Sequence, residues 1–151
     1  MISRLNKALT YSFITLFFVA PLVLHPNTSE LFEFNKMVAT YLFTTIITSL
    51  WLAKMVISRK IIFKRTPLDI PLLVFLASQI LSMLVSFDVR TSILGYYSRF
   101  HGGLLSSISY SVLYWAFVSN MDKEKVKKSL HALLATAVPV SIYGILQHFG
   151  A

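Results

Sequence analysis

Residues 88–103 read DVRTSILGYYSRFHGG, and this stretch separates two strongly apolar parts of the chain. It holds two arginines, two tyrosines, a histidine and a Gly-Gly pair, whereas residues 70–87 and 102–121 carry no charged side chain. A polar turn between two apolar segments of this length predicts a connection between two membrane-spanning helices. We therefore expect the stretch to lie at a membrane surface, held there by the rest of the chain.

The composition supports a membrane protein. Hydrophobic residues make up 56% of the chain and charged residues only 13%, about half the charged share of a soluble domain. The sequence contains no cysteine, which excludes disulfides, thiolate metal sites and a cysteine nucleophile. The net charge is +8, but in so apolar a chain the distribution of the charges matters more than their sum. It indicates the orientation of the chain in the membrane rather than the class of its binding partner.

Charged residues divide the sequence into five uncharged segments, each long enough, or nearly so, to cross a hydrocarbon core of about 30 Å. Helices are expected rather than strands, because an isolated strand in lipid leaves its backbone groups unpaired. The sequence therefore predicts an all-α, polytopic transmembrane helix bundle that occupies residues 1–151 as one unit. The expected spans are residues 8–25, 37–57, 67–87, 103–119 and 129–148.

The basic residues predict the orientation. The N-terminal tail and the connections after the second and fourth spans hold eleven of the 14 lysines and arginines, leaving Lys36, Arg90 and Arg99 on the other side. Short loops rich in lysine and arginine remain in the cytoplasm. We therefore expect a cytoplasmic N-terminus, with residues 88–103 and the C-terminus outside. This distribution accounts for the net charge and makes nucleic acid an unexpected partner.

Several polar side chains within the spans are best explained by helix packing. Two sets recur at four-residue spacing and would each form a stripe along one helix: Thr40, Thr44 and Thr48, and Ser78, Ser82 and Ser86. Hydroxylated stripes let membrane helices approach closely and form hydrogen bonds. Gln79 is interpreted in the same way. The run Thr66-Pro67-Leu68-Asp69 predicts a helix start whose acid reaches back to the cap, so Asp69 needs no catalytic role.

The arginines of the 88–103 stretch are the strongest candidates for binding a substrate. Arginine offers a fixed fork of donors that matches phosphate oxygens, and Arg99 is flanked by aromatic residues able to stack on a sugar. This combination suits the diphosphate and first sugars of a lipid-linked glycan. In the alternative interpretation, the arginines bind lipid headgroups and the aromatics form an ordinary interfacial belt.

The candidate residues fall into two groups. The expected phosphate-binding residues are Arg99, Arg90 and Lys36, and the expected glycan-contacting residues are Tyr96, Tyr97 and His101. Lys36 also fits an interface anchor, and His101 fits either a general base or a residue without a catalytic role. Glu30 and Glu33 form at most a weak acid pair, and no nucleotide-binding, zinc-protease or catalytic-triad motif is recognisable. No catalytic residue is assigned, and no metal or other cofactor is expected.

Four stretches together resemble the O-antigen ligase and polymerase family of bacterial inner-membrane proteins. They are LFEFNKM at 31–37, TPLDIPLL at 66–73, TSILGYYSRFHGGL at 91–104 and SIYGILQHFG at 141–150. The resemblance implies transfer of a glycan from undecaprenyl diphosphate to a lipid or glycan acceptor at the periplasmic face, without a metal, as in lipopolysaccharide synthesis. It also implies that arginines grip the donor diphosphate, and Arg99 is the best match to such a motif position.

The resemblance covers only the N-terminal helices of that family. Its large periplasmic loop, which carries most of the catalytic residues, follows further helices that this sequence lacks. We therefore expect an N-terminal part that is inactive by itself and whose partners are the lipid bilayer, the polyprenyl-linked glycan and the remaining helices. Two alternatives stay open: a transporter or flippase segment for a lipid-linked saccharide, and a small non-catalytic membrane subunit. A transporter should show several polar mid-span residues and a repeated half, and Gln79 alone does not meet that expectation.

Overall fold

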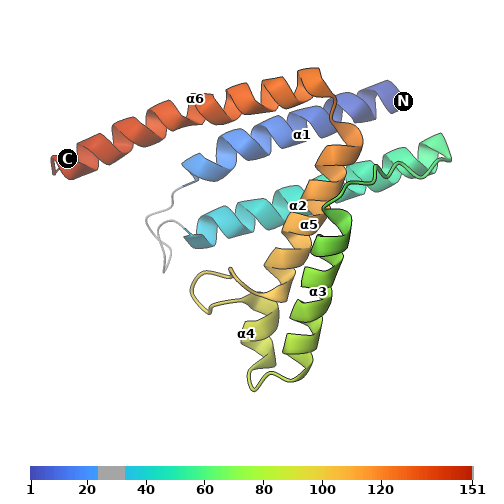
Figure 1. Cartoon of the computed structure of the whole chain (residues 1–151). Coiled ribbons are helices and arrows are strands. Elements are labelled where there is room, and N and C mark those ends of the chain that lie inside the picture. Colours follow the sequence, from blue (N-terminus) through green and yellow to red (C-terminus); the bar gives the residue numbers. More distant parts are fainter. Residues whose placement is uncertain (24–32, 151) are drawn as a thin grey trace.

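The computed structural model describes residues 1–23 and 33–150, and its regular structure is entirely helical (Figure 1). The helices are α1 (Ile2–Leu22), α2 (Glu33–Ser58), α3 (Asp69–Leu84), α4 (Val89–Leu94), α5 (Leu104–Asn120) and α6 (Lys123–His148). The predicted all-α class is confirmed. The five expected spans fall on α1, α2, α3, α5 and α6, although residues 24 and 25 of the first span lie outside the described residues.

Three of the helices, α1, α2 and α6, are long and apolar enough to cross a membrane. Helices α3 and α5 have 16 and 17 residues, shorter than the roughly 20 that a perpendicular span requires. The chain therefore has the character of a membrane protein. The count of five spans and the side on which each terminus lies remain predictions.

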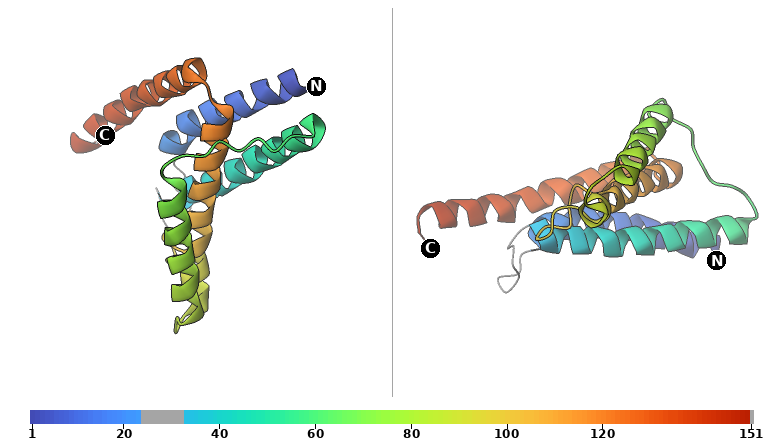
Figure 2. Two further views of the ribbon diagram at one scale, coloured as in Figure 1. Left: turned by 45° about the vertical axis from the view of Figure 1, so that its right-hand side comes forward. Right: turned by 90° about the horizontal axis from the view of Figure 1, so that it is seen from below.

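The helices are arranged in two groups (Figures 1 and 2). Helices α1 and α6 run side by side in the same direction, and α2 runs beside α1 in the opposite direction. Helix α5 crosses this layer steeply, over α2, and α3 packs antiparallel against α5 and projects from the layer. The bundle therefore differs from five helices lying side by side, because α5 packs across α2 rather than along it.

The hydrophobic core lies where α1, α2 and α5 meet. Its buried side chains are Leu9, Phe13, Leu16, Ile47, Trp51, Leu113 and Ala116. The rings of Phe13 and Phe117 meet edge to face, with centroids 5.2 Å apart. The indole N–H of Trp51 donates a hydrogen bond of 3.0 Å to the carbonyl of Ile62, in the extended segment between α2 and α3. A buried indole needs such a partner, so this bond ties the segment to the core.

The connections gather at two ends of the structure. At the end called here the basic end (residues 1–7, 54–65 and 120–128), the Lys54 ammonium donates to the Asn120 side chain at 2.8 Å. At the other, the loop end (residues 33–41 and 95–103), the Tyr41 hydroxyl donates to the Phe100 carbonyl at 2.7 Å. The structure thus brings the predicted cytoplasmic connections together and separates them from the predicted outer ones.

The two hydroxylated stripes behave differently. In α2, Thr40 is buried and its hydroxyl donates to the Lys36 carbonyl at 2.8 Å, as a packed stripe should. In the α3 region, Ser78 and Ser82 are exposed, so their predicted packing is wrong; Ser86, beyond the end of the helix, is half-buried and its hydroxyl accepts from the Ser92 hydroxyl at 2.6 Å. The half-buried residues of that helix repeat at the spacing of a different face. They include Leu72, Leu76, Gln79 and Met83. This spacing places Gln79 on the packed side of α3, in agreement with its interpretation as a packing residue.

The predicted contact between Asp69 and Thr66 is present, although α3 begins at Asp69 and its N-cap is Leu68 rather than Thr66. The backbone N–H of Thr66 donates to Asp69 Oδ2 at 2.8 Å, and the Thr66 hydroxyl donates to Oδ1 at 2.8 Å. The structural role of Asp69 is therefore confirmed. Helix α5 adds two further bonds that the sequence did not predict: Trp115 Nε1 donates to Asp69 Oδ1 at 3.0 Å, and the Tyr114 hydroxyl donates to Thr66 Oγ1 at 2.8 Å. These two bonds join α3 to α5.

Candidate functional site

The loop at residues 95–103 is a compact turn fixed by its own backbone. The N–H of Tyr96 donates to the His101 carbonyl at 3.1 Å, which closes the base of the loop. The N–H groups of Arg99 and Phe100 both donate to the Tyr96 carbonyl, at 3.0 and 2.9 Å. Phe100 adopts a φ of 52°, a conformation that few non-glycine residues adopt. The loop therefore presents its side chains from a defined backbone.

Two glycines allow the base of this loop to close. Gly95 has a φ of 87°, and a Cβ added there would lie 2.2 Å from the His101 carbonyl oxygen. A Cβ added at Gly103 would lie 2.3 Å from the Gly95 nitrogen. Both distances are far inside van der Waals contact, so only glycine fits at either position. The close approach of the two chain segments depends on the missing side chains.

A short helix that the sequence analysis did not predict, α4, leads into the loop. Its N-cap is Asp88, whose carboxylate accepts hydrogen bonds from the Thr91 N–H at 3.1 Å and the Thr91 hydroxyl at 2.5 Å. These hydrogen bonds, that of the hydroxyl above all, hold the pKa of Asp88 below its ordinary value. The signal was present, since an aspartate three residues before a threonine is typical of a helix start. On α4, the Arg90 guanidinium lies 5.6 Å from the centre of the Tyr97 ring.

Arg99 lies against the start of α2. Its Nη1 atom is 3.2 Å from Glu33 Oε2, and its guanidinium lies 5.7 Å from the centre of the Tyr96 ring. The Arg99 and Glu33 side chains are 47% and 49% exposed, so this ion pair contributes only about 0–1 kcal/mol to stability. The pair positions the guanidinium without burying it. A phosphate arriving from solvent can therefore compete with Glu33 for it.

A cavity of about 210 Å³ lies beside this ion pair. It is lined by Glu33, Lys36, Met37, His101 and Tyr110. The Tyr110 hydroxyl is 3.0 Å from the Met37 sulfur, and the Tyr110 and His101 rings are 6.4 Å apart. Helix α2, the loop and helix α5 each supply part of the lining, so residues far apart in the sequence share one site.

The structure brings together some of the predicted site residues and separates others. Lys36 and His101 line the cavity, and Arg99, with Tyr96 against it, binds the cavity residue Glu33. Arg90 and Tyr97 instead form a pair of their own and are not in the cavity lining. Glu30, which was weighed as a partner of Glu33, lies outside the described residues.

Three residues of the cavity were not predicted from the sequence or had little support in it. Lys36 and Met37 follow Glu33 by three and four residues. This spacing places the three residues on one face of a helix and was recognisable in the sequence. Tyr110 had no such signal, because its place in the cavity depends on how α5 crosses α2.

Chemically, the site offers an arginine fork, an ammonium, an imidazole and a phenol. This set suits anionic and hydroxyl-bearing ligands better than apolar ones. The described residues contain no group of three His, Asp or Glu side chains able to hold a metal ion.

Comparison of the chain with known protein families, with characterised proteins and with solved structures gives no match. The functional interpretation therefore depends on the residues of the site and on their geometry.

Proposed function

We propose that the chain is the N-terminal membrane portion of a glycosyltransferase of the O-antigen ligase type, acting at the periplasmic face of the bacterial inner membrane. Its role is to bind the diphosphate of an undecaprenyl-linked glycan at the loop end. The observation that carries the proposal is the convergence of Arg99, Lys36 and His101 around Glu33, from segments more than sixty residues apart.

In this proposal, Arg99 supplies the main contact to the donor. Its planar fork donates two hydrogen bonds to phosphate oxygens, while Glu33 and the Tyr96 ring hold the guanidinium in place before the donor arrives. Lys36, one turn further along α2, adds a second positive charge at the cavity. The His101 and Tyr110 side chains complete the lining and contact the sugar next to the diphosphate. The residues that perform the transfer itself are not assigned in this chain.

A second candidate function, that of a non-catalytic membrane subunit, is favoured by one observation. No residue of α3 is buried, and residues 137–148 of α6 are exposed throughout, although both regions are largely apolar. Such faces suit lipid or the helices of another membrane protein. The two candidates differ in their ligands, since a purely structural subunit has no need to recognise a diphosphate.

The test measures binding of undecaprenyl diphosphate to the chain in lipid nanodiscs. Arg99→Lys keeps the positive charge and loses the fork, so we expect it to weaken binding about tenfold or more. Arg90→Lys is the matched control: it is the same change at an arginine of the same segment that does not reach Glu33, and it should bind like the wild type. Equal affinity of the two variants would remove Arg99 from the site and leave the subunit as the better function.

Glu33 provides a test in the opposite direction. If phosphate displaces the Glu33 carboxylate, Glu33→Gln should strengthen binding by up to about fivefold, because the exposed ion pair that competes with the ligand is worth about 0–1 kcal/mol. Glu124→Gln, which removes the same charge at the basic end, should leave the affinity unchanged. A weaker complex with Glu33→Gln would show that Glu33 orients Arg99 more than it competes with the ligand.

A further inference from the structure

A second polar cavity lies at the basic end, between the starts of α1 and α6. It has a volume of about 330 Å³. Its lining is Ser3, Asn6, Lys7, Thr10, Tyr11 and Ile14 of α1 with Lys125 and Lys128 of α6. Three lysines from two helices therefore face one space, and none of them belongs to the loop-end site.

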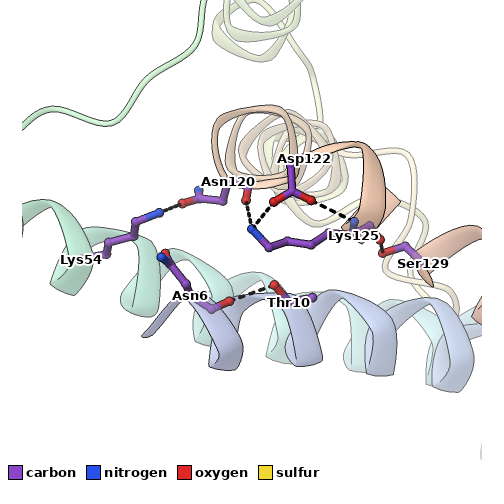
Figure 3. Close-up of polar contacts among 7 residues, drawn as sticks. All are labelled: Asn6, Thr10, Lys54, Asn120, Asp122, Lys125 and Ser129. Atoms are coloured by element: carbon purple, nitrogen blue, oxygen red, sulfur yellow. Dashed lines mark hydrogen bonds and ion pairs between the residues drawn. The ribbon is translucent and has the colours of Figure 1, made fainter. Parts of the chain in front are cut away.

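The lysines of this cavity are poorly neutralised. The Lys125 ammonium lies 2.7 Å from Asp122 Oδ2 and donates to the Asn120 carbonyl at 3.5 Å, and its side chain runs beside α1 near Asn6 (Figure 3). For Lys7 and Lys128, the described part of the chain supplies no carboxylate within ion-pair distance. The three ammonium groups of the cavity therefore have one carboxylate partner, that of Asp122, which is not itself in the lining.

The helix ends add to this excess of positive charge. Helices α1 and α6 run in the same direction, so both N-termini lie at the basic end. A helix N-terminus carries a partial positive charge, which disfavours nearby lysines and favours an anion. The first turn of α1 has no acidic residue. Helix α6 has Glu124 in its first turn and the Asp122 carboxylate as its N-cap, and neither residue is in the cavity lining. An anion held between the two helices would offset the repulsion among the lysines and the repulsion between the lysines and the helix N-termini.

We propose that this cavity binds a phosphate group, carried either by the headgroup of an anionic lipid or by a soluble phosphate compound. Lys7 and Lys128 supply the charge, Lys125 contributes while paired with Asp122, and the Ser3 hydroxyl and Asn6 amide supply neutral donors. Ile14 lies two turns beyond Asn6 and gives one end of the cavity an apolar wall, which suits the acyl part of a lipid. Basic pockets between membrane helices bind phosphate headgroups in this way.

The experiment compares two double variants that lose the same charge from the same helices. Lys7→Gln/Lys128→Gln removes two lysines of the cavity, and Arg4→Gln/Lys127→Gln removes two cations outside its lining. In phosphatidylcholine nanodiscs that contain phosphatidylglycerol, native mass spectrometry counts the phosphatidylglycerol molecules retained. A lysine near an anionic headgroup raises the affinity about fivefold. The affinity of the cavity variant for phosphatidylglycerol should therefore fall about thirtyfold, and that of the control variant should change little.

A second arm identifies the source of the phosphate. Wild-type chain in phosphatidylcholine alone is titrated with radiolabelled inorganic phosphate, which is then added in millimolar excess to the phosphatidylglycerol complex. Binding and displacement by inorganic phosphate would assign the site to soluble phosphate compounds, whereas retention of phosphatidylglycerol would assign it to a lipid. The cavity variant should reduce whichever binding is observed.

Two further variants separate binding from folding. Lys7→Arg/Lys128→Arg restores both charges and should restore binding. Asn6→Asp changes almost no volume and places a negative charge in the cavity, so it should weaken binding while circular dichroism shows unchanged helix content. The proposal is overturned if the cavity variant retains both ligands like the wild type. It is equally overturned if the control variant loses as much as the cavity variant, because binding would then follow the total charge of the basic end.

Discussion

The two ends of the molecule use positive charge in different ways. At the loop end, Arg99 contacts Glu33 and Tyr96, and Arg90 of the adjoining helix α4 contacts Tyr97. At the basic end, the segments that hold eleven lysines and arginines contain only two carboxylates, those of Asp122 and Glu124, and Asp69 at the start of α3 lies near Arg65. A few cations in fixed geometry suit recognition of one ligand, whereas many cations with few partners suit orientation in the membrane and attraction of an anionic surface. The number of charges therefore says less about a site than the partners of each charge.

The largest expected effect concerns the sides of the membrane on which the two ends lie. The chain has no cysteine, so the single variants Ser98→Cys and Lys60→Cys each carry one thiol. If the basic end is cytoplasmic, a membrane-impermeant maleimide added to intact spheroplasts should label the Ser98→Cys variant and leave the Lys60→Cys variant unlabelled. After lysis, both variants should be labelled.

The reverse pattern would place the loop end in the cytoplasm and would contradict the proposed periplasmic function. Labelling of both variants on intact spheroplasts would mean that the two ends are not separated by the membrane. In either case, the difference in positive charge between the two ends would not indicate how the chain is oriented in the membrane. The phosphate cavity at the basic end would still stand as a binding site, because its geometry does not depend on the compartment.

The next largest effect tests how firmly the loop end is fixed. Gly95→Ala forces a Cβ to within 2.2 Å of the His101 carbonyl at a φ of 87°, so we expect the loop to open and to lose about 2 kcal/mol or more. A bismaleimide should join thiols placed by Glu33→Cys and Arg99→Cys, and Gly95→Ala should abolish this cross-link.

Gly144→Ala is the matched control, since a Cβ there meets nothing within 4 Å. It should leave the cross-link intact and stabilise α6 by about 0.5–1 kcal/mol. An unchanged cross-link with Gly95→Ala would show that the loop does not need its closed base.

The sequence predicted the five longer helices and the grouping of the connections, because both depend on local hydropathy and charge. The steep crossing of α5 over α2 and the packing of α3 against α5 were not predictable in this way, because both depend on which side chains interlock. The same limit explains the serine stripe of α3, since spacing defines a face of a helix and does not say which face is packed. At the site, the spacing of Glu33 and Lys36 was recognisable, whereas the place of Tyr110 requires the crossing of α5 over α2.

The smallest expected effect compares the helix caps of the two ends in acid. Asp88 caps α4 near the loop end, and Asp122 caps α6 at the basic end, where it accepts a hydrogen bond from the Lys125 N–H and is paired with the Lys125 ammonium. Hydrogen bonds, from the Thr91 hydroxyl and N–H in one case and from Lys125 in the other, lower the pKa of both carboxyl groups. A lowered pKa in the folded state means that each cap stabilises its helix above the ordinary pKa of aspartate, about 3.9, and loses this contribution as the pH falls through the folded value.

Amide hydrogen exchange at the first turns of α4 and α6 measures this loss, and both turns should exchange faster at about pH 2 than at about pH 5 once the intrinsic rates are corrected. Asp88→Asn keeps a good capping side chain that does not titrate, so in this variant the α4 turn should show no pH dependence while the α6 turn keeps its own. The α6 turn should respond more strongly, because protonation of Asp122 also removes the partner of Lys125 and leaves the three lysines of the cavity without a carboxylate. Added phosphate, which is an anion at about pH 5, should protect the α6 turn at that pH and leave the α4 turn unchanged. Equal protection of both turns would mean that the anion acts on the whole chain rather than at the cavity.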